Sequence, residues 1–139
     1  MNAMIYRAQP SQIDRLIRKH LEGKLTEMEI QTLVSSSEFS DPVLVGMYED
    51  KLVCLAGLVP LTLLSNTAHI WLYATEELSK HKIKFGRHSR HVINDLLNLY
   101  PTLIGQCYTP SAVSWLDWLG AEFTSPLGLA FPFTLRKSS

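Results

Sequence analysis

The stretch from Ala68 to Tyr100 constrains the fold more than any other part of the sequence. Residues 68–75 (AHIWLYAT) combine β-branched, aromatic and aliphatic side chains, which predicts a buried strand. Apolar residues then recur at helical spacing from Phe85 to Tyr100, which predicts a helix with one buried face. A buried strand followed by an amphipathic helix is typical of a βαβ unit, and therefore of a sheet with helices packed against it.

The segment that joins this strand to this helix is strongly basic. Between residues 80 and 91 the chain carries five of its 13 Lys and Arg residues, three of its five His residues and no acid. Cations are unfavourable at a helix start, because the aligned peptide dipoles already place positive charge there. An anion held by free helix amides would offset this repulsion. The charge fits an anion site and a solvated helix face equally well.

Composition limits the classes of protein that the chain can belong to. It has 13 acidic and 13 basic residues, which argues against a chain that coats nucleic acid or binds an acidic membrane. A hydrophobic content of 46% and a charged content of 19% fit one globular domain over residues 1–139. The N-terminus lacks a secretion signal, and no apolar run is long enough to span a bilayer as a helix.

Cysteine and histidine usage narrows the chemistry. Cys54 and Cys107 lie in apolar runs and are expected to be buried free thiols, which is typical of a cytoplasmic protein. His88 and His91 have no carboxylate or cysteine partner near them in the sequence, so we expect no metal site.

Turn and capping residues divide the rest of the chain into short elements. We expect N-caps at Ser11, Thr26 and Thr109, with Pro110 in the first turn of the last helix. Gly57 suggests a bulge or a close approach, and Pro132 a bulge or a shortened last strand. The predicted order is βααβββαβαββ: an α+β fold of about seven strands and about four helices. Strands are expected at residues 4–8, 43–48, 52–60, 68–75, 103–108, 121–124 and 129–135.

In this element order the chain resembles the GNAT (Gcn5-related N-acetyltransferase) family over nearly its whole length. Residues 112–123 (AVSWLDWLGAEF) are similar to that family's signature of a helix followed by Leu-Gly-Phe. The resemblance implies a GNAT-like mixed sheet in which the fourth strand and the next helix hold acetyl-CoA. Residues 71–123 also resemble a small family of GNAT-like internal virion or assembly proteins of short-tailed phages.

The resemblance implies a cofactor loop, and that loop is degenerate. The family holds pyrophosphate with a Gln/Arg-x-x-Gly-x-Gly/Ala motif, which residues 81–86 (HKIKFG) match at Gly86. His81 replaces the Gln or Arg, and Lys84 replaces the first glycine, where it would contact phosphate as a point charge. The cofactor-binding residues implied are Leu72, Tyr73 and Ala74 for the pantetheine arm, and Lys82, Lys84, Phe85, Gly86 and Arg87 for the phosphates.

Candidates for proton transfer are few. The family often places a tyrosine acid in the helix near residues 110–119, where this chain has Leu116. The strand at residues 68–75 contains no acid, which leaves His69 and Tyr73 as catalytic candidates. A hydrogen-bonded structural histidine and a partly buried strand tyrosine are the alternatives for these two. We expect four further acids to be solvated: Glu27, Glu29, Glu76 and Glu77.

Three functions remain open at this point. The first is an acetyl-CoA-dependent N-acetyltransferase whose acceptor is a small-molecule or protein amine. The second is an inactive GNAT-fold phage structural or virion-assembly protein, in the host cytoplasm or the virion, whose exposed Trp115 and Trp118 contact protein partners. The third is local nucleic-acid binding by residues 80–91. An open cleft between the fourth and fifth strands favours the first; a cleft filled by Phe85, Leu116 or Trp115 favours the second.

Overall fold

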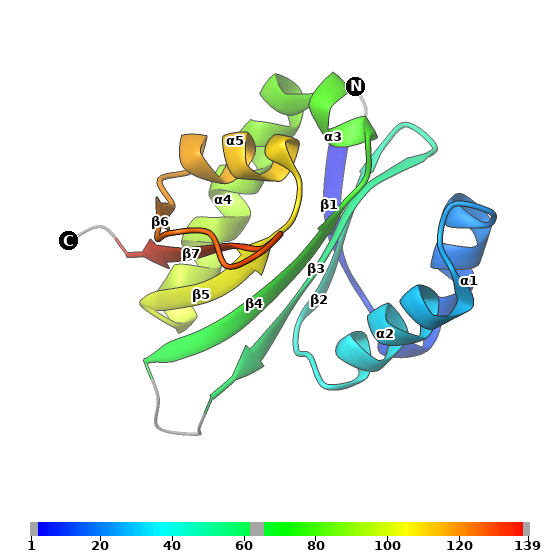
Figure 1. Cartoon of the computed structure of the whole chain (residues 1–139), viewed down its shortest axis with the longest axis horizontal. Helices are drawn as coiled ribbons and strands as arrows, with labels where there is room; N and C mark the ends of the chain where they lie inside the picture. Colours follow the sequence, from blue (N-terminus) through cyan, green and yellow to red (C-terminus); the bar gives the residue numbers. More distant parts are fainter. Residues whose placement is uncertain (1–2, 62–65, 138–139) are drawn as a thin grey trace.

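The computed structural model describes residues 3–61 and 66–137 of the chain (Figure 1). Its strands are β1 (Ala3–Ala8), β2 (Val43–Tyr48), β3 (Lys51–Pro60), β4 (Thr67–Ala74), β5 (Thr102–Cys107), β6 (Glu122–Phe123) and β7 (Phe131–Arg136). Its helices are α1 (Pro10–Leu21), α2 (Glu27–Glu38), α3 (Glu77–Lys80), α4 (Lys82–Leu99) and α5 (Pro110–Trp118).

The strands form one seven-stranded mixed sheet in the order β1-β2-β3-β4-β5-β7-β6. Strands β1 to β4 are an antiparallel meander, and β5 then joins β4 in parallel. A parallel neighbour needs a crossover connection, which α3 and α4 supply. The predicted α+β order is therefore confirmed, with α3 as an addition: this short helix lies where the sequence suggested a loop.

Helices cover both faces of this sheet, so the protein has two separate apolar cores. Helices α1 and α2 pack on one face, around Ile13, Ile17 and Leu55. Helices α4 and α5 pack on the other face, around Phe85 and Leu116 (Figure 1). Alternation along β4 divides its side chains between the two layers, because successive strand residues point to opposite faces. Ile70 and Leu72 join the α4–α5 core, whereas Trp71 and Tyr73 join the α1–α2 core.

Two of the three predicted helix starts are confirmed. The side chain of Thr26 accepts a hydrogen bond from the Glu29 amide, and that of Thr109 accepts one from the Ala112 amide. The prediction for α1 is wrong: its cap is Gln9 and not Ser11. Pro10 occupies the first helical position, because its fixed φ and missing N–H suit that position. The helix therefore begins earlier in the sequence than a cap at Ser11 would allow.

The two strand irregularities expected from Gly57 and Pro132 have different outcomes. Gly57 permits a close approach, because a Cβ there would meet the indole of Trp71 and, at 2.6 Å, Oγ of Ser40. The register shift in this hairpin lies instead between Gly46 and Met47. Strand β7 is shortened as expected: it begins at Phe131, so that Pro132 falls in its first two residues.

Candidate functional site

Strands β4 and β5 separate before either strand ends. Their parallel pairing runs from Thr67 opposite Thr102 to Trp71 opposite Gln106. Beyond this point Ala74 still pairs with Cys54 of β3, and Cys107 pairs with Phe131 of β7. Strand β4 thus stays paired with β3, and β5 stays paired with β7, while the pairing between β4 and β5 ends. The sheet is therefore open between β4 and β5.

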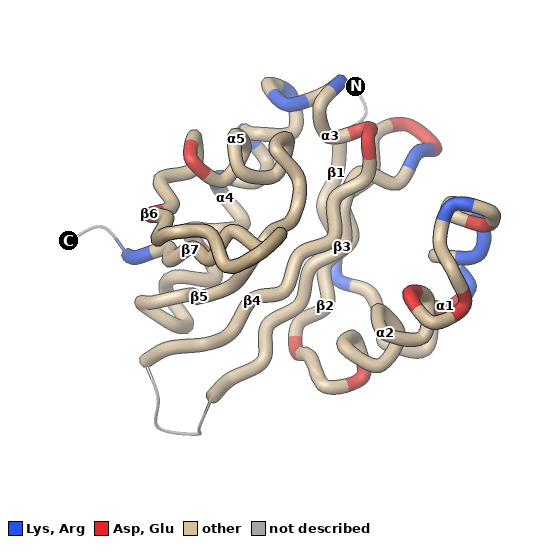
Figure 2. Tube along the Cα trace, in the orientation of Figure 1, with Lys and Arg blue, Asp and Glu red and all other residues tan. Residues whose placement is uncertain are grey.

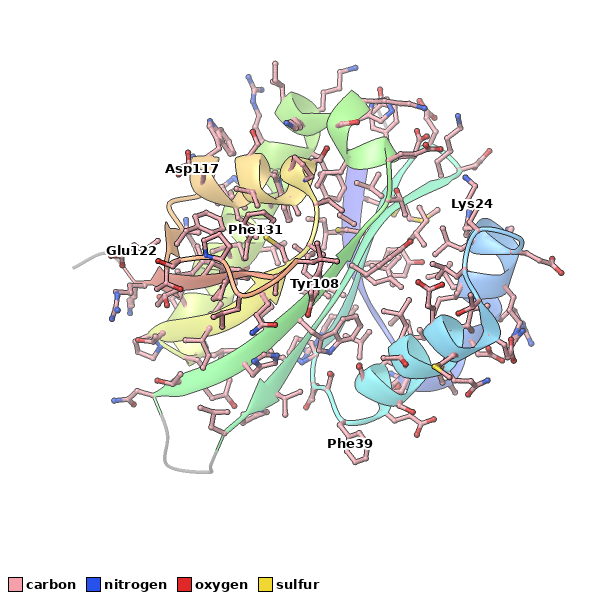
Figure 3. The ribbon with its side chains drawn as sticks, in the orientation of Figure 1. Lys24, Phe39, Tyr108, Asp117, Glu122 and Phe131 are labelled. Atoms are coloured by element: carbon pink, nitrogen blue, oxygen red, sulfur yellow. The ribbon has the colours of Figure 1, made fainter. Side chains whose placement is uncertain are left out.

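A cavity of about 460 Å³ lies at this separation, and we call it the β4–β5 pocket. This volume falls in the usual range for small-molecule sites. Figure 3 shows Tyr108 at the end of β5, on the side of β4. The pocket is lined by Leu72, Tyr73 and Ala74 of β4, by Cys107, Tyr108, Thr109 and Ala112, and by Leu25, Met28, Glu29, Thr32 and Leu33 in and before α2.

The backbone of β4 turns polar groups toward this separation. The amide of Thr75 donates to the carbonyl oxygen of Val53 on β3, at 2.9 Å. Peptide groups alternate between the two edges of a strand, so those of Leu72 and Ala74 point away from β3, toward the side of β5. At Ala74 this side has lost its paired strand. The end of β4 can therefore offer backbone donors and acceptors to an extended ligand.

The three side chains that could have filled the separation lie elsewhere. Phe85, Trp115 and Leu116 are buried in the α4–α5 core and are not among the residues that line the β4–β5 pocket. Of the two tryptophans that the second function requires to be exposed, Trp115 is packed in the core with only 6% accessible, whereas Trp118 is 52% exposed. Within the described part of the chain, Nε1 of Trp115 is a buried donor without a hydrogen-bond partner.

The two candidates for proton transfer occupy different places. Tyr73 lines the pocket, and burial together with the negative charge of Glu29 raises the pKa of its hydroxyl. Tyr73 is thus protonated at neutral pH and can act as a donor. His69 lies four residues earlier on the same face of β4, about 13 Å away along a strand and opposite Ile104, where β4 and β5 are still paired. The structure therefore does not bring His69 to the pocket.

Both cysteines are buried free thiols, as expected. Burial raises the pKa of Cys54 to about 12 and also raises the pKa of Cys107. Cys107 borders the pocket, yet its thiol contacts the carbonyl oxygen of Phe131 at 3.8 Å. A thiol held in its protonated form is a poor nucleophile, so neither cysteine is suited to covalent chemistry.

The free amides at the start of α4 lie earlier than the resemblance implied. The Phe85 amide donates to the carbonyl oxygen of His81 at 2.9 Å, and this is the first turn of the helix. Amides at residues 82–84 precede that bond, whereas those of Gly86 and Arg87 lie in the second turn, where amides bond within the helix. An anion at this helix end would meet the amides of Lys82, Ile83 and Lys84 rather than those of residues 85–87.

The basic residues at the start of α4 are partly engaged within the protein. The ring of His81 stacks on that of Tyr48, with centroids 3.8 Å apart, and Nζ of Lys84 lies 3.2 Å from the Tyr48 hydroxyl. Figure 2 shows Lys and Arg positions near the acidic positions at the start of α3. Glu77, one of those acids, pairs with Lys80 at 3.1 Å and with His81 at 3.6 Å. The local positive charge is thus smaller than the sequence of residues 80–91 suggested.

Glu77 is also buried, and the expectation that it is solvated is wrong. Burial alone would raise the pKa of its carboxyl, but the hydrogen bond from Lys80 and the charges of Lys51, Lys80 and His81 outweigh it and lower the pKa. Glu77 is the first residue of α3, the short helix that lies where the sequence suggested a loop.

Several pocket residues were not predicted from the sequence. Glu29 was interpreted as a solvated acid, and Met28, Thr32 and Tyr108 were given no role. The capping pattern of Thr26 and Glu29 fixed where α2 begins, and it is the one signal that could have placed Met28 and Glu29 on the first turn. Which strand faces that turn depends on tertiary packing, which the pattern does not contain.

Residues 3–61 and 66–137 contain no group of three His, Cys, Asp or Glu side chains placed to hold a metal ion. None of the described helices is long and apolar enough to cross a membrane.

Comparison with known proteins places this geometry in a known fold. No family model matches the sequence, and no curated protein matches it. Solved structures do match. The structure is similar to ribosomal-protein-S5-alanine acetyltransferase from Vibrio fischeri, with a TM-score of 0.65 and 11% identity over 99% of this chain and 94% of that one.

Two further solved structures show the same likeness. A putative GNAT-family acetyltransferase from Desulfovibrio desulfuricans matches with a TM-score of 0.61 and 13% identity, over 96% of this chain and 98% of that one. The N-acetyltransferase PseH from Campylobacter jejuni matches with a TM-score of 0.60 and 13% identity, over 99% and 100% of the two chains. The protein therefore has the GNAT fold, a mixed seven-stranded sheet with helices on both faces.

Proposed function

We propose that the protein is an acetyl-CoA-dependent N-acetyltransferase that uses the β4–β5 pocket. The observation that carries this proposal is the separation of β4 and β5 after Trp71 and Gln106, with a cavity of about 460 Å³ at the point of separation. The acetyltransferase names of the similar solved structures support the same reaction class. Their sequence identity of 11–13% is low, so the chemistry must come from the chain's own residues.

The residues present fit the acyl donor at its thioester end. Peptide groups of Leu72 and Ala74 point toward the side that β5 has left, and they would bind the amide groups of a pantetheine arm as a neighbouring strand would. Cys107 and Ala112 add a small, mostly apolar wall on the other side of the pocket. A narrow apolar channel with backbone hydrogen bonds suits such an arm.

The fit at the phosphate end depends on the first turn of α4. The amides of residues 82–84 precede the first helical hydrogen bond, and the helix dipole favours an anion there. Lys82 and Lys84 would add positive charge. Lys84 would have to exchange its contact with the Tyr48 hydroxyl for a phosphate oxygen, which is a short movement for an exposed, flexible side chain.

When bound, acetyl-CoA supplies an activated acyl group. Starting from an ammonium group, transfer would form a bond between the nitrogen and the acyl carbon and break the carbon–sulfur bond. The nitrogen would lose two protons, of which the thiol keeps one and solvent takes the other. The chain's contribution is mainly positioning, because holding the amine against the thioester carbonyl removes most of the entropic barrier. The protonated hydroxyl of Tyr73 is the group that can donate a proton to the leaving sulfur.

A second candidate is a GNAT-fold protein that no longer binds the cofactor, such as the virion-assembly proteins to which the sequence has a resemblance. The contacts of His81 with Tyr48 and Glu77 favour it, because they engage the residue at the family's Gln/Arg position. In this case Trp118, which is exposed beside Arg90, would contact a protein partner.

Calorimetric titration with CoA and with acetyl-CoA, at two salt concentrations, tests the proposal. We expect micromolar binding that weakens with salt, since part of it comes from phosphate contacts. Lys84→Ala should weaken binding about tenfold, because it removes a charged hydrogen-bond donor. Lys19→Ala is the matched control: this exposed lysine lies on α1, on the opposite face of the sheet, and its removal should change nothing. No binding at millimolar CoA would contradict the proposal and leave the second candidate.

A further inference from the structure

We infer that the acceptor taken by the β4–β5 pocket is a primary amine attached to an apolar group, and that Glu29 selects its positive charge. This inference rests on the proposed function and names the substrate class of the same site. It excludes acidic acceptors and acceptors that are polar throughout.

The charge in the pocket comes from one side chain. Of the twelve described residues that line it, only Glu29 is charged. The carboxylate is held in place, because its Oε1 accepts a hydrogen bond from the Thr26 amide at 2.8 Å. A carboxylate has two oxygens and about four acceptor sites, so capacity remains for an ammonium group. Glu29 of α2 and Tyr73 of β4 line the same pocket, and the negative charge of Glu29 adds to burial in raising the pKa of the Tyr73 hydroxyl.

Most of the other polar side chains of the pocket already have hydrogen-bond partners, so few of them compete with Glu29 for an ammonium group. The hydroxyl of Thr32 donates to the Met28 carbonyl oxygen at 2.9 Å, and that of Thr109 caps α5. The Tyr108 hydroxyl lies 3.2 Å from Oε1 of Gln106. Of the hydroxyls in the described lining, Tyr73 alone makes no such contact within the described residues. An amine held by Glu29 would thus approach the β4 strand beside the proton donor.

The rest of the pocket wall is apolar and remains accessible. Met28 is 80% exposed and Tyr108 is 60% exposed, although both side chains line the cavity. Leu25 and Leu33 of the α2 region add aliphatic surface to the lining. A hydrophobic rim around a single acid binds an amine with an apolar body, because the apolar part loses water while the ammonium keeps a partner.

Binding of three small probes to the purified protein tests this inference without any acyl transfer. The probes are 2-phenylethylamine, its uncharged counterpart 2-phenylethanol, and ethylamine, which keeps the charge and lacks the ring. Amide resonances of residues 28, 29, 73 and 108 report where each probe binds. We expect 2-phenylethylamine to bind most tightly and to shift these four resonances.

Glu29→Gln separates the charge of Glu29 from its capping role, since a glutamine oxygen can also accept the Thr26 amide. The substitution should weaken the binding of 2-phenylethylamine by up to about fivefold at low salt and leave the affinity for 2-phenylethanol unchanged. Glu38→Gln removes the same charge at the far end of α2 and should have no effect.

The outcomes separate this inference from the proposed function. Equal binding of the amine and the alcohol, or an amine affinity that Glu29→Gln does not lower, would overturn the inference even if acetyl-CoA binds. Selective amine binding in a protein that does not bind acetyl-CoA would support the amine site and reject acyl transfer. If none of the three probes binds at the pocket, the inference is wrong.

Discussion

The indole of Trp118 lies directly on Gly86. A Cβ at Gly86 would come within 2.7 Å of Cζ3 of that ring, although Trp118 lies at the end of α5 and Gly86 in the second turn of α4. Arg90, one turn later in α4, also contacts Trp118: its guanidinium carbon lies 4.3 Å from the ring centroid, and Nη2 donates to the Trp118 carbonyl oxygen at 3.2 Å. Glycine in this position therefore serves helix packing, whatever it contributes to a ligand.

Gly86→Ala should lower the free energy of unfolding by about 1–3 kcal/mol, because the new methyl group overpacks the contact with Trp118. Helix propensity acts in the opposite direction, since alanine in a helix is favoured over glycine by about 1 kcal/mol. The sign of the effect should therefore reverse in a Trp118→Ala background, where the clash is absent. Urea unfolding of the two single variants and the double variant measures both effects. A destabilisation that persists without the indole would contradict this account of Gly86.

Ser40→Ala should destabilise the protein by about 1–3 kcal/mol, because it leaves the indole N–H of Trp71 without its acceptor. That N–H donates to Oγ of Ser40 at 2.6 Å, and Ser40 is 8% exposed. Ser36→Ala is the control: its hydroxyl donates to the Thr32 carbonyl oxygen of its own helix, and we expect a change within about 0.5 kcal/mol. Similar losses for the two variants, measured by urea unfolding, would argue against a structural role for the Ser40–Trp71 pair.

Thr26→Ala should lower the stability by about 1 kcal/mol, since it removes the cap of the Glu29 amide at the start of α2. Glu29→Gln should be nearly neutral, because the reciprocal bond to the Thr26 amide survives. Thermal unfolding of both variants checks the difference. A large loss for Glu29→Gln would mean that the carboxylate charge has a structural role, and would weaken its use as an acceptor-binding group.

Cys54 should make the protein less stable at alkaline pH. Burial raises the pKa of its thiol from 9.0 to about 12 in the folded state. Between these values the unfolded chain has lost the proton and the folded chain keeps it, so the unfolding free energy falls by about 1 kcal/mol per pH unit as the pH rises. Below pH 9 the effect is absent. Cys54→Ala should reduce this slope in urea unfolding measured at pH 7.5 and 10.5; an unchanged slope would contradict it.

The element order could be predicted from the sequence because its signals are local. Apolar periodicity, Thr26 as a cap, Pro110 at a helix start and Gly120 with φ of 98° after α5 each depend on a few neighbouring residues. Where local signals compete, as at Pro10 and Ser11, the predicted cap lies two positions from the observed one, Gln9.

The candidate site could be predicted only in part, because it depends on which partner each strand keeps. Residues 72–74 follow from the strand pattern and the resemblance, and they do line the pocket. The contribution of α2 depends on how this helix lies across the sheet, which no local pattern encodes. The burial of Glu77 likewise depends on a four-residue helix that has no periodicity to detect.

Mapping of CoA binding by amide resonances tests the central claim most directly, namely that the separation of β4 and β5 forms the cofactor site. We expect CoA to shift the amides of Leu72, Ala74 and residues 107–109, together with those of residues 82–84 at the start of α4. The second half of α4 and strand β1 should stay unchanged. Shifts confined to the exposed basic face of α4, around Arg87 and Arg90, would contradict the claim and show that CoA meets the protein only as an anion.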